Sequence, residues 1–135
     1  MKVETKTLHL NLKKKWFDMI ASGNKKEEYR EVKDYWCQRL LLDHNGERIN
    51  NENAKNLCEA LTYAVNPRVM DSLLPKKAII SYDKVIFKNG YSKNAPTLIV
   101  QFKGILIGSG QKELGANEDS IYFKIQLGEI LHKNL

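Results

Sequence analysis

Hydrophobic and polar residues alternate near the start of the chain. Leu8, Leu10 and Leu12 are separated by His9 and Asn11. A period of two is typical of a strand with one buried face. The pattern therefore predicts a half-buried strand that leads directly into the next element.

A short amphipathic helix is predicted at Lys13–Ser22. Trp16 and Ile20 are four residues apart and share one face of such a helix. Asn11 is a residue type that caps helix N-termini, and Gly23 is the type that ends helices in the left-handed conformation. We expect both residues to mark the limits of the helix.

The segment after Gly23 is dense in charge and has no apolar stripe at helical spacing, so we interpret residues 25–32 as a strand. Because side chains alternate between the faces of a strand, three charged residues would lie on one side and two charged residues with a tyrosine on the other. The two sets are Lys26, Glu28, Arg30 and Lys25, Glu27, Tyr29. A second helix is predicted at Asp34–Leu42, where Trp36 and Leu40 lie one turn apart.

Residues 43–75 are predicted to be a helical insertion. The part from Asp43 to Asn53 is polar, contains Asn-Gly and indicates a surface loop. An amphipathic helix then contains Leu57, Cys58, Leu61 and Val65. Pro67 can begin a further short helix that carries Val69, Met70 and Leu73.

The remainder of the chain has the pattern of strands separated by turn residues. The predicted strands are Ala78–Tyr82, Lys84–Lys88, Thr97–Ile107 and Ile121–Leu127. In the last of these, we expect the core on the side of Ile121, Phe123, Ile125 and Leu127. An early strand and helix followed by a later group of antiparallel strands predict an α+β domain built around a small curved sheet or barrel.

Composition narrows the class of protein. The 135 residues are 42% hydrophobic, enough for one folded domain, and no segment has the apolar length of a membrane span. We expect no secretory signal, a cytoplasmic location and no membrane partner. The net charge is +6, and the first 39 residues contribute +4 of it, so an anion-facing surface is expected to begin there.

Metal and cofactor chemistry has little support in the sequence. His9, His44 and His132 are far apart, and Cys37 and Cys58 form no CxxC motif, so core packing is the simpler interpretation of the cysteines. The glycines near residue 110 form neither a dinucleotide-binding fingerprint nor a phosphate loop. We expect no metal and no cofactor.

The strongest candidate for chemistry is the charged run from Ser22 to Arg30. Its structural interpretation is an edge strand that charges protect from aggregation. Its functional interpretation is the wall of a polar cleft. In such a cleft Glu28 accepts from an exocyclic amine or holds a lysine, while Lys25 or Arg30 binds a phosphate or carbonyl oxygen.

This run resembles the opening signature of the ASCH domain family, which has a PUA-like fold. The family motif Gly-x-Lys-x-x-Glu-x-Arg is matched by Gly23, Lys25, Glu28 and Arg30. Residues 85–91, 98–105 and 123–130 resemble the bacterial and phage branch, so the resemblance spans nearly the whole chain. It implies a single domain over 1–135, a small, mostly antiparallel β-barrel with flanking helices, and a cleft for RNA or modified nucleosides.

The resemblance also implies an enzymatic alternative. Some bacterial members are amidohydrolases that use a lysine, a threonine and a glutamate, and others have been described as ribonucleases. Lys25 matches the lysine, but Glu28 stands where the threonine is expected. The family's acidic residue has no match, because Gln101, which lies on a later predicted strand, is not a carboxylate. The reaction of these amidohydrolases, removal of an acetyl group from the exocyclic amine of cytidine, therefore does not transfer intact. Glu28 as a general base with Lys25 stabilising an oxyanion is the remaining scheme.

Two hypotheses follow. The first is a module that binds RNA or nucleotides, in which Lys25, Lys26, Arg30 and, more weakly, Arg39 contact phosphates while Tyr91, Tyr29 or Trp36 stacks on a base. The second is a hydrolase that acts on RNA or modified nucleosides through Lys25 and Glu28. Structural alternatives stay open: core packing for Trp36, a hairpin end for Tyr91 and a surface ion pair with Asp43 or Glu31 for Arg39.

Overall fold

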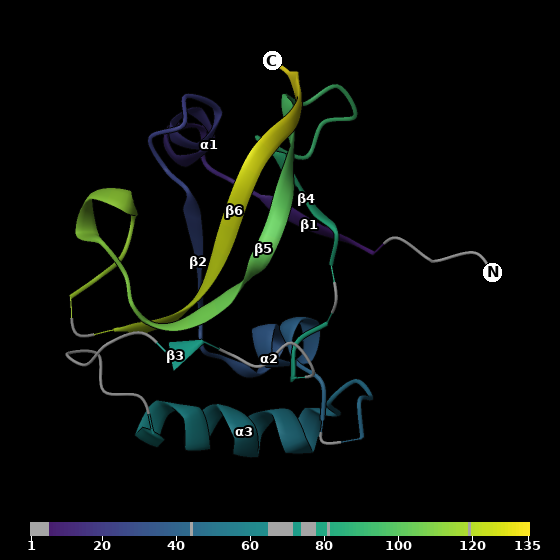
Figure 1. The fold of residues 1–135 in the computed structure, drawn as a ribbon, viewed down its shortest axis with the longest axis vertical. Coiled ribbons are helices and arrows are strands. Elements are labelled where there is room, and N and C mark those ends of the chain that lie inside the picture. Colours follow the sequence, from purple (N-terminus) through teal and green to yellow (C-terminus); the bar gives the residue numbers. More distant parts are fainter. Residues whose placement is uncertain (1–5, 44, 65–71, 74–77, 81, 119) are drawn as a thin grey trace. The chain divides into compact units, whose positions relative to one another are not determined.

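The protein has a mixed α+β fold. A computed structural model describes residues 6–43, 45–64, 72–73, 78–80, 82–118 and 120–135 (Figure 1). The helices in these ranges are α1 (Lys14–Ala21), α2 (Asp34–Leu40) and α3 (Asn51–Ala64). The strands are β1 (Thr7–Asn11), β2 (Glu27–Glu31), β3 (Ser72–Leu73), β4 (Lys84–Lys88), β5 (Thr97–Ser109) and β6 (Ile121–Asn134). The predicted α+β class is confirmed.

The strands in the described ranges belong to one sheet with the order β1-β4-β5-β6-β2, and β3 pairs with β5. The chain divides into two units, of which the first comprises residues 1–27, 81–103 and 126–135. The second comprises residues 28–80 and 104–125, and the two units share the long strands β5 and β6. Over the described parts of the chain, every helix is too short or too polar to cross a bilayer.

The first unit is built on β1, β4 and the beginning of β5. β1 pairs with β4 in parallel and β4 pairs with β5 in antiparallel register. Alternate residues of the three strands are in line and buried, as period-two patterning requires. The buried rows are Leu8–Val85–Val100 and Leu10–Phe87–Leu98. The alternation of leucines and polar residues thus predicted the buried face of β1.

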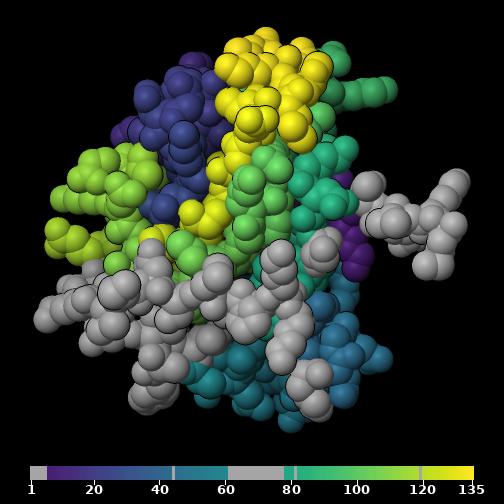
Figure 2. All heavy atoms as spheres, in the orientation of Figure 1, coloured from purple at the N-terminus to yellow at the C-terminus, as the bar shows by residue number. Residues whose placement is uncertain are grey.

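Helix α1 follows β1 and buries Phe17 and Ile20. The expected cap at Asn11 is wrong, because the N-cap position is Lys13 and Asn11 belongs to β1. The far end of β6 reaches this helix, since Lys133 Nζ donates to the carbonyl of Ala21 at 2.8 Å. The two elements are blue and yellow neighbours in Figure 2.

In the second unit, α2 packs against α3, and the Cys58 thiol donates to the carbonyl of Val32 at 2.8 Å. The predicted extent of α2 to Leu42 is too long, because Leu41 already has extended backbone angles. The predicted strand at Ala78–Tyr82 is also wrong. In the described part of this segment, residues 78–80 and 82, the pairing is one isolated bridge between Ile79 and Leu41.

The predicted insertion contains α3, which begins at Asn51, inside the segment expected to be a loop. Asn50 explains the early start, because its Oδ1 accepts the backbone N–H of Asn53 at 2.8 Å and caps the helix. The helix proposed after Pro67 lies partly outside the described residues. Leu73, which was expected in it, instead belongs to β3 and pairs with Leu106.

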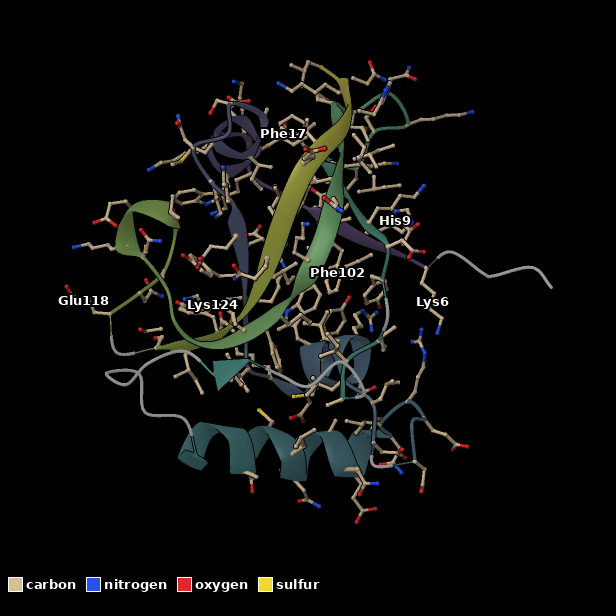
Figure 3. All side chains as sticks on the ribbon, viewed as in Figure 1. Lys6, His9, Phe17, Phe102, Glu118 and Lys124 are labelled. Carbon is tan, nitrogen blue, oxygen red and sulfur yellow. The ribbon has the colours of Figure 1, made fainter. Side chains whose placement is uncertain are left out.

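Strand β6 is covered on both faces along its first half, which corrects the expectation of one buried side. Phe123 and Ile125 are fully buried, but Tyr122 and Lys124 are only 6% exposed. Figure 3 labels Lys124. The Tyr122 ring packs on Tyr29 with centroids 5.4 Å apart. Alternation of apolar and polar residues does not predict burial in this strand, because residues on both of its faces are covered by other elements.

Candidate nucleotide-binding residues

The charged segment leaves α1 through a tight turn. Gly23 has a φ of +85°, which L side chains rarely adopt, and its N–H donates to Ile20. The N–H of Lys25 then donates to the carbonyl of Met19 at 3.0 Å, so the chain is tied back onto the helix. The prediction that Gly23 ends the helix is confirmed. This turn fixes the position at which the Lys25 side chain leaves the backbone.

Lys25 is buried, with 2% of its surface exposed. Its Nζ lies 4.5 Å from the centroid of the Trp16 ring, and Lys15 Nζ lies 4.7 Å from the same centroid. An indole face attracts ammonium groups through its quadrupole. Lys26 is exposed, and its carbonyl accepts from the N–H of Leu127 at 3.0 Å. Lys26 precedes β2, which begins at Glu27.

Glu28 is a buried carboxylate of the second unit, and each of its oxygens faces a donor. Its side chain is 5% exposed, and Oε2 forms an ion pair with Nη1 of Arg30 at 3.1 Å. Oε1 accepts the backbone N–H of Tyr29 at 2.8 Å. Both oxygens therefore have donors, and Glu28 acts as an organiser of Arg30, because its carboxylate holds the guanidinium in place. A solvated edge strand does not describe this residue.

Arg30 connects the buried carboxylate to aromatic side chains on α2. Its Nη1 also donates to the carbonyl of Tyr29 at 2.8 Å, and its Cζ lies 5.2 Å from the Trp36 ring centroid. Trp36 meets Tyr35 edge to face at 4.9 Å. The Cζ of Arg39 lies 3.8 Å from the centroid of Tyr35. We call Arg30, Trp36, Tyr35 and Arg39 the arginine–aromatic surface.

The arginine–aromatic surface is accessible at one end. Tyr35 is 53% exposed and Arg39 is exposed, whereas Trp36 is half-buried. Sequence reasoning selected Arg30, Trp36 and Arg39 but missed Tyr35 as a stacking residue. The available signal was the four-residue spacing from Tyr35 to Arg39, which places the two side chains next to each other on a helix.

The predicted candidates are divided between the two units. Lys25, Lys26 and Tyr91 belong to the first unit, whereas Glu28, Arg30, Trp36 and Arg39 belong to the second. Within the second unit, the structure brings Arg30 together with Glu28 and Trp36. Tyr91 is 93% exposed, in the connection between β4 and β5.

The cysteines and acidic residues give no sign of a metal site within the described ranges, where no three His, Cys, Asp or Glu side chains gather. Cys37 is fully buried and Cys58 partly buried, and both are free thiols. Burial, reinforced by the neighbouring Cys58, raises the pKa of the Cys37 thiol to about 12. Such a thiol behaves as a small core residue.

Comparisons with protein-family models, with curated proteins and with solved structures gave no match to this chain.

Proposed function

We propose that the protein binds single-stranded RNA or nucleotides and that the arginine–aromatic surface contacts the base. The observation that carries the proposal is the half-exposed Tyr35 ring with the Arg39 guanidinium 3.8 Å from its centroid. Proteins bind unpaired bases by stacking them on aromatic rings and guanidinium planes. Tyr35 and Arg39 present both kinds of plane on the exposed side of α2.

The charge around this surface favours recognition of a base over tracking of a phosphate chain. Residues 28–39 carry three acidic and three basic side chains, so their formal charges cancel. The charge of Arg30 is opposed directly by Glu28. A ligand is therefore expected to gain more from stacking than from counterion release, and its affinity should depend only moderately on salt.

The resemblance to the ASCH family supports the same class of ligand. Gly23, Lys25, Glu28 and Arg30 match the family motif, and the α+β sheet is compatible with the PUA-like barrel that we propose on that basis. The hydrolase remains the alternative. It is less well supported, because both oxygens of Glu28 already accept hydrogen bonds or pair with Arg30, and a general base needs an oxygen directed at water.

Binding of a fluorescein-labelled 12-nucleotide single-stranded RNA, followed by anisotropy at about 50 mM salt, tests the proposal. Tyr35→Ala should weaken binding by about 5- to 150-fold, the loss expected for one stacked base. Tyr35→Phe should bind like the wild type, because the ring is retained. Mass spectrometry of the RNA and of modified nucleosides after incubation tests the hydrolase alternative.

Arg48→Ala provides a matched control for Arg39→Ala, because Arg48 is an exposed arginine of the same unit outside the arginine–aromatic surface. We expect the Arg39 variant to lose affinity and the Arg48 variant to keep it. If the wild type fails to bind, or if Tyr35→Ala and Arg39→Ala bind as tightly as Arg48→Ala, the proposed function is wrong.

A further inference from the structure

A hollow of about 280 Å³ lies on the first unit, at the end of the β1–β4 pair. It is lined by His9, Leu10, Asn11, Ile86, Lys88 and Tyr91. The register explains this grouping, since His9 is opposite Ile86 and Asn11 opposite Lys88. His9 and Lys88 are exposed, and Figure 3 labels His9 on β1. Three of the lining side chains, those of His9, Asn11 and Lys88, thus carry nitrogen, and Leu10 and Ile86 are apolar.

The loop that carries Tyr91 is anchored to β1. Nδ2 of Asn11 donates to the carbonyl of Gly90 at 2.7 Å, and the N–H of Gly90 donates to Oδ1 of Asn11 at 3.2 Å. Asn89 adds a third bond, from its Nδ2 to the carbonyl of Leu12 at 3.1 Å. The backbone next to Tyr91 is therefore fixed. An aromatic ring that is 93% exposed on an anchored loop is available to a ligand at little ordering cost.

The lining has the chemistry of a site for a small anion with a flat ring. Lys88 carries a positive charge, His9 offers an imidazole N–H, and none of the six lining residues is acidic. Phosphate oxygens accept from such donors, and every nucleobase has a face that stacks on an aromatic ring. The volume is at the lower end of small-molecule pockets, about 300 Å³, which suits one nucleotide.

We propose that this hollow binds a nucleoside monophosphate, with the base on the Tyr91 ring and the phosphate at Lys88 and His9. This site goes beyond the proposed RNA-binding surface and does not depend on it, because all its residues belong to the first unit and all those of the arginine–aromatic surface to the second. The exposed loop and the parallel strand pair thereby acquire a common role.

Isothermal titration of the full chain with adenosine and cytidine 5′-monophosphates tests the inference. Tyr91→Ala should weaken binding of at least one of them by about 5- to 150-fold, and Tyr91→Phe should not. Lys88→Gln should weaken binding of the monophosphate by at least about threefold but leave the weaker binding of the free nucleoside unchanged. Tyr91 is almost fully exposed, so thermal denaturation of the Ala variant should match the wild type.

Lys93→Gln is the matched control, because Lys93 is an exposed lysine of the same loop that does not line the hollow. It should bind the monophosphates like the wild type. The inference is overturned if neither monophosphate binds at millimolar concentration, if inorganic phosphate binds as tightly as the nucleotides, or if Tyr91→Ala and Lys88→Gln match Lys93→Gln. The Tyr35→Ala variant should keep this site, so failure here is distinct from failure of RNA binding.

Discussion

The buried pair of Glu28 and Arg30 should contribute measurable stability, and removal of its charge tests how the charged strand is organised. Glu28→Gln keeps the size of the side chain and an oxygen for the N–H of Tyr29 but removes the charge opposite Arg30. Breaking a fully buried pair costs about 3–5 kcal/mol. Arg30 retains 17% side-chain exposure and some hydration, so we expect a loss of about 2 kcal/mol.

Urea denaturation followed by circular dichroism measures this loss. With a slope of about 2 kcal/mol per molar urea, a loss of about 2 kcal/mol lowers the midpoint by about 1 M. Arg30→Met keeps much of the packing on Trp36 and removes the positive charge. The double variant should lose less than the sum of the single variants, with a coupling energy of about 1–3 kcal/mol, because neither charge is then left without its partner.

Glu31 and Lys33 provide the matched comparison. Oε2 of Glu31 lies 2.8 Å from Nζ of Lys33, close to the 3.1 Å between Oε2 of Glu28 and Nη1 of Arg30. The side chains of Glu31 and Lys33 are, however, 60% and 67% exposed. Glu31→Gln should leave the midpoint unchanged within experimental error, because water screens an exposed pair. Equal midpoints for Glu28→Gln and Glu31→Gln, or zero coupling between Glu28 and Arg30, would refute the assignment of Glu28 as a buried organiser.

Two further predictions concern the second unit. Gly110→Ala should lower the free energy of unfolding by about 1–3 kcal/mol, because a Cβ at this position would lie 2.6 Å from the Cβ of Ala116 and 2.9 Å from the Tyr29 ring. Thermal or urea denaturation measures the loss. A midpoint equal to that of the wild type would show that these neighbours move to make room. Cys37, with its pKa raised to about 12, should resist alkylation at pH 8 in the folded protein. The pKa of the Cys37 thiol is higher in the folded than in the unfolded protein, so its contribution to stability is complete below about pH 9 and is lost as the pH rises toward 12. Cys37→Ala should remove this pH dependence when the free energy of unfolding is measured against pH.

Strands with strong local patterning and flanking turn residues were predictable, whereas the segment from Ala78 was not. β4 has the predicted bounds, and the β1 leucines predicted the buried side, because alternation and turn residues are local signals. The segment from Ala78 has the local pattern of a strand, but in its described part the pairing is one isolated bridge from Ile79 to Leu41. Local propensity contains no information on the length of the strand opposite.

The candidate residues were predicted by type more readily than by role. The density of charge around Glu28 marked the segment, but the sequence did not reveal that both Glu28 oxygens are engaged in the folded chain. The stack of Arg39 on Tyr35 follows helical spacing and was within reach of sequence reasoning. The hollow beside Tyr91 was not, because it depends on the parallel register of two strands that are far apart in the sequence.

The hydrogen bonds between Asn11 and Gly90 join residues 79 positions apart, and this separation has a consequence for synthesis of the chain. The first strand leaves the ribosome long before its parallel neighbour exists. Its leucines therefore remain exposed until β4 and β5 have been made, and the contact cannot help the early steps of folding. A nascent chain stalled before residue 84 should consequently be a better substrate for chaperones than the finished protein.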